Sequence, residues 1–168
     1  MTVMKGLAGQ GKLGSVELSD MAKHGARIAS AASQFEGDAG ANVMKVGMLA
    51  QGSRGGGGAW NAATAAASVS GLVTTFTAPE RLKHFRNAPG GPINLKGEGG
   101  KLRDPVEIIK EAIDKTGGDI QKLQPMFANI VGARAMKGLS SKYLEGSGGK
   151  TDDESKAKGR AAVQAEID

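Results

Sequence analysis

The stretch DPVEIIKEAIDKTGGD, residues 104–119, decides the fold of this chain, because it carries both the start and the end signals of one helix. Asp104 is a favoured N-cap residue, and Pro105 suits the first helical position. Gly117 suits the left-handed conformation that ends helices, and Asp119 is placed to cap a following helix. Four apolar residues share one face: Ile108, Ile109, Ala112 and Ile113. The stretch therefore predicts a helix with one buried face.

Helical patterns continue toward the N-terminus. The apolar residues of the first predicted helix recur every three or four positions: Leu18, Met21, Gly25, Ile28, Ala32 and Phe35. Gly37 is expected to end this helix, and Asp38 to cap a second helix over 41–51. The glycine-rich run 52–58 is expected to break the chain, because consecutive glycines lose much backbone entropy in a helix. An Ala-rich helix is then predicted over 59–76.

Further signals lie between that helix and residue 145. Thr77 and Glu80 match a capping box at the start of a short helix. Residues 93–103 predict one small β-hairpin, because short apolar runs flank a cluster of glycines. An apolar helical stripe continues after residue 119, with an interruption at Pro125. Its members are Ile120, Leu123, Phe127, Ile130 and Val131.

We therefore expect a mainly α protein built of several Gly- and Ala-rich helices. Its predicted parts are a helical segment over 1–145, a flexible Gly-rich linker over 146–150 and a C-terminal amphipathic helix over 151–168. The apolar face of the last helix is thin: Ala161, Ala162, Ala165 and Ile167. No capping signal follows it, which predicts a chain that is truncated or continued at this end.

Composition narrows the function classes. The chain has no cysteine, which excludes disulfides, thiolate zinc sites and cysteine nucleophiles. Its two histidines, His24 and His84, lack partner patterns and are interpreted as surface residues. The stretch 6–12 has the G-x-x-x-x-G-K spacing of a phosphate loop, but Leu13 stands where Ser or Thr would bind magnesium. We expect no catalytic residue, no cofactor and no metal site.

Basic residues are concentrated between positions 79 and 103, where six bases stand against two acids, a local excess of four charges. The candidate contact patch consists of Arg81, Lys83, Arg86, Lys101 and Arg103. Such a patch suits phosphate or an acidic partner, and an ordinary solvated basic face is the alternative interpretation. Phe85 is the one aromatic residue among these bases, so a platform for stacking bases is not supported.

An uncharged stretch from Gly55 to Pro79 is long enough to span a bilayer. Its residues are mainly Ala, Ser, Thr and Gly, which contribute little free energy of transfer into lipid. A buried helix is the favoured interpretation, and a membrane-active helix at 59–78 is the alternative.

Four phrases, in the same order, resemble segments of phage tail tape measure proteins. Residues 11–22 (GKLGSVELSDMA) are similar to a phrase that opens a helix in that family, and residues 46–56 (VGMLAQGSRGG) resemble its next phrase. Residues 99–109 (GGKLRDPVEII) are similar to a GKLRDP phrase of the family, and residues 116–123 (TGGDIQKL) resemble a GD-containing one. The resemblance covers about residues 6–140.

The resemblance implies a structural protein that acts in tail assembly, in length determination and in genome ejection. The partners it implies are the tail tube protein, tail assembly chaperones and baseplate or tail tip proteins; homo-oligomers and contact with DNA stay open, and a membrane is not expected. The implied location is the lumen of the virion tail, and the host cytoplasm during assembly.

A single straight helix of this chain would span only about 250 Å. Glycine and proline breaks exclude even that rod, so the chain corresponds to a segment rather than to the ruler itself. The alternative function is a small basic helical module that binds nucleic acid or an acidic partner.

Overall fold

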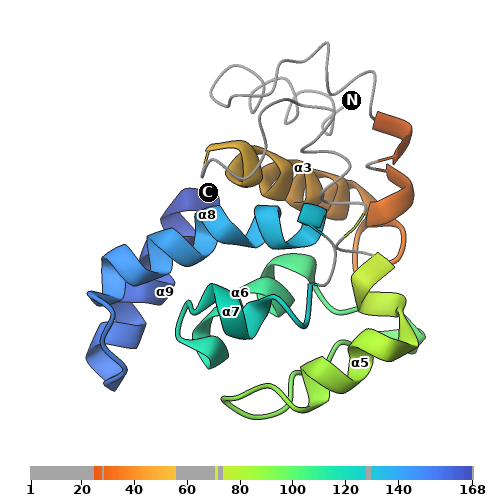
Figure 1. Cartoon of the computed structure of the whole chain (residues 1–168). Coiled ribbons are helices and arrows are strands. Elements are labelled where there is room, and N and C mark those ends of the chain that lie inside the picture. The colour runs from red at the N-terminus through yellow and green to blue at the C-terminus, as the bar shows by residue number, and fades with distance from the viewer. Residues whose placement is uncertain (1–24, 28, 56–70, 72–73, 128–129, 168) are drawn as a thin grey trace.

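The computed structural model describes residues 25–27, 29–55, 71, 74–127 and 130–167, and it is mainly helical, which confirms the expected fold class (Figure 1). The long helices are α3 (Ala39–Gly55), α6 (Pro105–Thr116), α8 (Ile130–Ser147) and α9 (Asp153–Ile167). The shorter ones are α5 (Pro79–Arg86), α7 (Ile120–Leu123) and the 3-10 turn η1 (Glu98–Gly100). Residues 25–27, 29–32, 71 and 74–77 are also helical.

Helix α6 begins and ends as the sequence predicts. The Asp104 carboxylate accepts hydrogen bonds from two backbone N–H groups of the first turn, at 2.9 and 3.4 Å. Gly117 follows the helix in the left-handed conformation with φ 67°. The predicted apolar face is completely buried: Ile108, Ile109, Ala112 and Ile113 each expose 0% of their surface. Helix α6 contacts α3, α7, α8 and α9, so this face lies at the centre of the bundle.

All four phenylalanines of the chain form one cluster. Phe76 lies edge-on to Phe35, Phe85 and Phe127, with ring centroids 5.7 to 6.4 Å apart. Phe85 and Phe127 are also in edge-to-face contact, at 5.6 Å. Such pairs contribute about 0.5–1.5 kcal/mol each beyond the area they bury. The cluster therefore joins three regions that are far apart in the sequence, around residues 35, 76–85 and 127.

Helices α8 and α9 pack closely along their length (Figure 1). The sequence predicts a flexible linker over 146–150, whereas the structure places Gly146 inside α8 and leaves a short turn between Ser147 and Asp153. A methyl group on Gly146 would lie 2.7 Å from the Lys158 carbonyl oxygen, so α9 approaches too closely for a side chain. This contact holds Gly146 in the helix despite its low helix propensity.

The buried face of α9 differs from the predicted one. Gly159, Val163 and Ile167 are buried, at spacings of four residues. Ala161 and Ala165 are exposed, although the sequence predicts them on the apolar face. The difference arises because α8 packs against α9 at Gly159. This contact turns the face that carries Gly159 and Val163 toward α8.

Two helix boundaries were predicted wrongly. Helix α3 continues to Gly55, beyond the break expected at Gly52, because packing against α8 and α6 outweighs the weak helix propensity of glycine. The N-cap of α5 is Ala78 without a side-chain bond, so the capping box of Thr77 and Glu80 does not form. Thr77 instead closes the preceding helical turn, and its hydroxyl donates to the Thr74 carbonyl at 3.1 Å.

The expected hairpin at 93–103 is reduced to a single antiparallel bridge between Lys96 and Leu102, and the described residues form no extended strand. Leu102 also pairs in parallel with Phe35. Its N–H donates to the Gln34 carbonyl at 2.9 Å, and its carbonyl accepts from the Glu36 N–H at 2.7 Å. The loop over 93–103 therefore pairs with residues 34–36 as well as with itself. Local sequence signals do not predict this long-range pairing.

None of the helices in the part of the chain that the structure describes combines the length and the apolar character needed to cross a membrane. Residues 59–70, 72 and 73 of the predicted helix over 59–76 lie outside the described residues, whereas residues 71 and 74–76 are helical.

Candidate functional site

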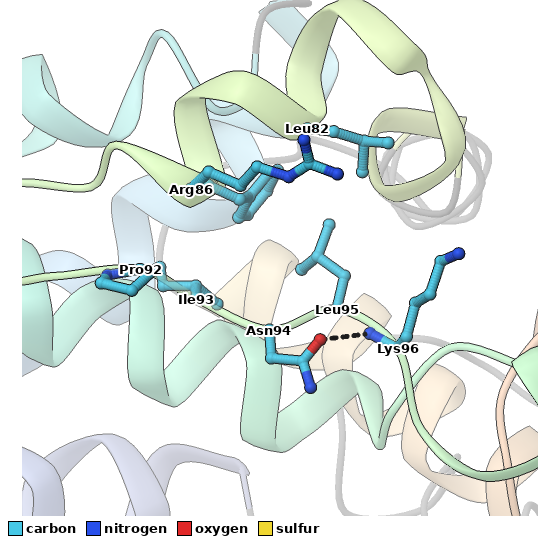
Figure 2. Close-up of a pocket in the computed structure, with 8 residues that line it drawn as sticks. Leu82, Arg86, Pro92, Ile93, Asn94, Leu95 and Lys96 are labelled. Carbon is cyan, nitrogen blue, oxygen red and sulfur yellow. Dashed lines mark hydrogen bonds between the residues drawn. The ribbon is translucent and has the colours of Figure 1, made fainter.

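A hollow of about 310 Å³ lies between α5 and the loop that follows it. Its floor is apolar and is formed by Leu82, Phe85, Ile93 and Leu95, while Arg86 and Lys96 flank it. Figure 2 shows Leu95 and Lys96 directed from the loop toward Leu82 and Arg86 on α5. The volume lies at the lower end of the range that binding sites for small ligands or anchor side chains occupy.

A second hollow of about 540 Å³ adjoins the first, and the two share Leu82, Leu95 and Lys96. It adds Phe76, Leu102 and Lys101 to the lining. We refer to the two hollows together as the α5 groove. The residues that line it include three charged side chains, and all three are cations: Arg86, Lys96 and Lys101.

A third hollow of about 810 Å³ continues from Lys96 and Lys101 around the loop tip. It is more open to solvent and has mixed charge, because Glu36 and Glu98 line it beside Arg103. The Glu36 carboxylate accepts a hydrogen bond from the Glu98 N–H at 2.7 Å. A methyl group on Gly97 would overlap the Glu36 carboxylate, so a side chain at that position would displace the end of the Glu36 side chain.

Arg103 fixes the other end of the loop. Its guanidinium donates to the Glu111 carboxylate at 2.9 Å and to the Asn94 carbonyl at 2.7 Å. Lys115 also pairs with Glu111, at 2.9 Å. Burial opposes ionisation of Glu111, but the hydrogen bonds and charges of Lys115 and Arg103 outweigh it and hold the pKa of its carboxyl below the ordinary value. The charge of Arg103 is therefore compensated within the protein.

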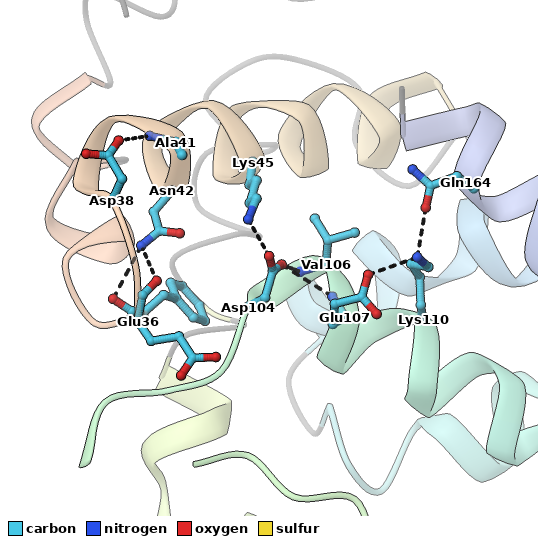
Figure 3. Close-up of polar contacts among 11 residues, drawn as sticks. Glu36, Asp38, Ala41, Asn42, Lys45, Asp104, Val106, Glu107, Lys110 and Gln164 are labelled. Carbon is cyan, nitrogen blue, oxygen red and sulfur yellow. Dashed lines mark hydrogen bonds and ion pairs between the residues drawn. The ribbon is translucent and has the colours of Figure 1, made fainter. Parts of the chain in front are cut away.

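A polar network fixes α6 between its neighbours (Figure 3). Lys45 on α3 forms an ion pair with Asp104, the residue that caps α6. Lys110 on α6 donates to Glu107 at 2.9 Å and to Gln164 on α9 at 2.8 Å. The network connects three helices, so the loop that ends at Asp104 has a rigid support.

The five predicted patch residues do not act as one set. The Arg81 guanidinium donates to the Pro125 carbonyl at 3.3 Å, and Lys83 is exposed on α5. Arg86 lines the first hollow, Lys101 the second and third, and Arg103 the third.

Lys96 lines all three hollows, and the predicted patch omitted it. A signal was present in the sequence: Ile93 and Leu95 alternate with Asn94 and Lys96, and the structure buries the first pair and exposes the second. Such alternation indicates an extended segment with one buried face, and it places Lys96 on the outer side.

Other candidate groups stay apart. His84 is half-buried on α5, while His24 and the stretch 6–12 lie outside the described residues. Within the described ranges, no three His, Asp or Glu side chains gather where they could share a metal ion. Neither a protein-family model, nor a curated protein, nor a solved structure matches this chain.

Proposed function

We propose that this chain is a structural protein of a phage or prophage tail, corresponding to a segment of a tape measure protein. It packs within the tail tube during assembly, contributes to length determination and leaves at genome ejection. Its partners are the tube protein, assembly chaperones and baseplate or tail tip proteins. The observation that supports the proposal is that the described residues of the family-like phrases make capping and packing contacts rather than a convergent set of reactive groups.

The phrase at 99–109 acts as a junction between segments. The Leu102 backbone lies between Phe35 and Lys96 and pairs with both. Arg103 links the loop to Glu111 on α6. Asp104 then caps α6 and pairs with Lys45 on α3. Each of these residues has a role in joining helices, which accounts for the phrase in structural terms.

The phrase at 116–123 makes the next junction. Gly117 ends α6, and the Asp119 carboxylate accepts from the Gln121 N–H at 2.9 Å, which caps α7. Leu123 is completely buried. A methyl group on Gly118 would lie 3.0 Å from the Tyr143 ring, so this turn packs directly on α8. The phrase therefore joins α6 to α7 and packs on α8.

Close packing through small residues suits a protein that is assembled into a tube and later released. Helices α8 and α9 approach each other closely at Gly146 and Gly159, where the Tyr143 ring of α8 packs on Gly159. Large side chains are buried around α6 and in the phenylalanine cluster, and Leu139 and Tyr143 of α8 and Val163 of α9 are buried as well.

The test is to delete the gene in the genome that carries it and to examine induced particles by electron microscopy. We expect tail tubes to be absent or altered in length, and wild-type protein supplied in trans to restore them. Ile109→Asp places a charge in the core and should not restore them, whereas Lys137→Glu on the exposed surface of α8 should. Normal tails after the deletion would contradict the proposal.

A further inference from the structure

The α5 groove combines an apolar floor with a row of cations. Leu82, Phe85, Ile93 and Leu95 form the floor, and Leu82 is the half-buried member of this set. Arg86, Lys96 and Lys101 are exposed along it. We propose that the groove binds an acidic amphipathic segment of a partner protein, with apolar anchors in the two hollows and carboxylates facing the three cations. This inference goes beyond the proposed tail function and does not rest on it.

The three cations are available to a partner. In the described part of the chain, no Asp or Glu forms an ion pair with Arg86, Lys96 or Lys101. Arg103, by contrast, is paired with Glu111 at 2.9 Å. Complementary charges that face each other across an interface fix its register and raise the association rate. An acidic partner therefore meets charge that the protein itself leaves uncompensated.

The acidic residues beyond the end of the groove limit where the carboxylates of the partner can bind. Beyond Lys101 the third hollow carries Glu36 and Glu98, which repel further carboxylates. The Glu36 side chain is fixed there by the Glu98 N–H. Acidic residues of the partner are consequently expected opposite the stretch from Arg86 to Lys101 and not past the loop tip. Attraction by the three cations and repulsion by the two carboxylates together fix the position of the partner in the groove as well as its affinity.

The floor favours a protein segment over a nucleic acid. Phe85 exposes 0% of its surface, and its ring contacts Phe76 and Phe127, so it has no free face on which a base could stack. Phosphate gains nothing from Leu82, Ile93 or Leu95. Apolar side chains of an amphipathic helix do gain from such a floor, and their spacing at i, i+3 or i+4 and i+7 suits an elongated groove.

The experiment uses the full chain and a fluorescein-labelled helical peptide of about 12 residues, with Leu at i, i+4 and i+7 and Glu on both flanks. Binding is measured by fluorescence anisotropy, and NMR amide shifts locate it. We expect shifts at α5 and at residues 93–102. The double variant Arg86→Glu, Lys96→Glu should bind at least about tenfold more weakly, because like charges then face each other. Lys137→Glu, with one reversed charge on α8, is the control and should change binding by less than about twofold.

Two further probes decide the outcome even if the double variant fails to fold. A peptide with Gln in place of Glu tests the charge, and a peptide with Ala in place of Leu tests the anchors; both should bind more weakly. Absence of binding by the acidic peptide, or equal binding by the Gln peptide, would overturn the proposal. A DNA oligonucleotide that binds with equal affinity and displaces the peptide would overturn it as well, in favour of a polyanion site.

Discussion

The Tyr143 hydroxyl donates a hydrogen bond to the Asp114 carboxylate at 2.9 Å, which links α8 to α6. Arg160 on α9 donates to the same carboxylate at 3.0 Å, so three helices meet at Asp114. The Tyr143 ring lies between Gly118 and Gly159, each of which would place a methyl group 3.0 Å from it. This tyrosine is therefore both a packing element and a polar link.

Gly159→Ala is expected to destabilise the protein. The new methyl group would meet the Tyr143 ring and the Tyr143 carbonyl oxygen at 3.0 Å. Overpacking costs about 1–3 kcal/mol, which exceeds the gain of about 1 kcal/mol in helix propensity. Urea denaturation measures the change. Gly25→Ala is the matched control, because its methyl group would meet none of the described residues within 4 Å. Equal stability changes for the two variants would contradict the close packing of α8 on α9.

Tyr143→Phe removes the hydroxyl and keeps the ring. The Asp114 carboxylate keeps its bonds to Arg160, so we expect a loss of only about 1 kcal/mol in the free energy of unfolding. Tyr143→Ala should cost about 3–5 kcal/mol, because it also leaves a cavity. Denaturation midpoints of the two variants separate the polar link from the packing.

Stability should fall at alkaline pH because of the same residue. Burial, together with the hydrogen bond to Asp114 and its negative charge, raises the pKa of Tyr143 well above its ordinary value of 10.0. The unfolded chain therefore loses this proton first as the pH rises above about 10, and the stability that the protonated hydroxyl contributes is lost from there upward.

Tyr143 is the one tyrosine of the chain, so an ultraviolet absorbance titration follows it directly. Tyr143→Phe should show a weaker decline of stability above this pH than the wild type. A titration midpoint near 10 in the folded protein would contradict the contact with Asp114.

Asp104→Ala is expected to cost about 1–2 kcal/mol, because α6 loses its N-cap. The ion pair with Lys45 is lost as well, but that pair is partly exposed and adds little. Asp104→Asn keeps a side-chain acceptor for the cap and removes the charge, so it should recover most of the loss. If both variants were equally destabilised, the ion pair rather than the cap would be the main contribution. The unfolding temperatures of the two variants, measured by circular dichroism, distinguish the contribution of the cap from that of the ion pair.

Glu111 should make the protein sensitive to acid. The pKa of its carboxyl is lowered by Lys115 and Arg103 despite partial burial, so its contribution to stability is present above the ordinary pKa of 4.5 and is lost as the pH falls below it. Glu111→Gln removes this dependence. We therefore expect the difference in urea midpoint between wild type and Glu111→Gln to be larger at neutral pH than in acid. A difference that stays constant with pH would contradict the ion pairs.

Much of the fold follows from local sequence signals. The cap, the buried face and the left-handed end of α6 are set by residues within the stretch 104–119, so pattern and structure agree there. Asp38 caps α3 as predicted, and its carboxylate accepts from the Ala41 N–H at 2.8 Å. Each of these features depends on neighbours in the sequence, which is why single-sequence reasoning finds them.

The remaining features depend on contacts between distant segments. Gly146 in isolation signals a linker, but it lies inside α8 and packs against Lys158 and Gly159 of α9. The alternation of buried and exposed residues over 93–96 indicates an extended segment, yet the groove that Leu95 and Lys96 line exists only because α5 lies across from them. Arg103 carries the same charge as Arg86, and only the structure shows that Glu111 compensates one and not the other.

The pairing of Leu102 with the Gln34 carbonyl has a consequence for the order of folding. The two residues are 68 positions apart in the sequence, whereas α8 and α9 are consecutive helices. Closing a long loop costs more chain entropy than joining neighbours, and contacts of high sequence separation form more slowly. We expect pulse-labelled hydrogen exchange to show protection of α8 amides before that of the Leu102 amide. The helical hairpin would then form before the loop that contains Leu102, and the groove beside α5 would take its shape only after that loop is closed.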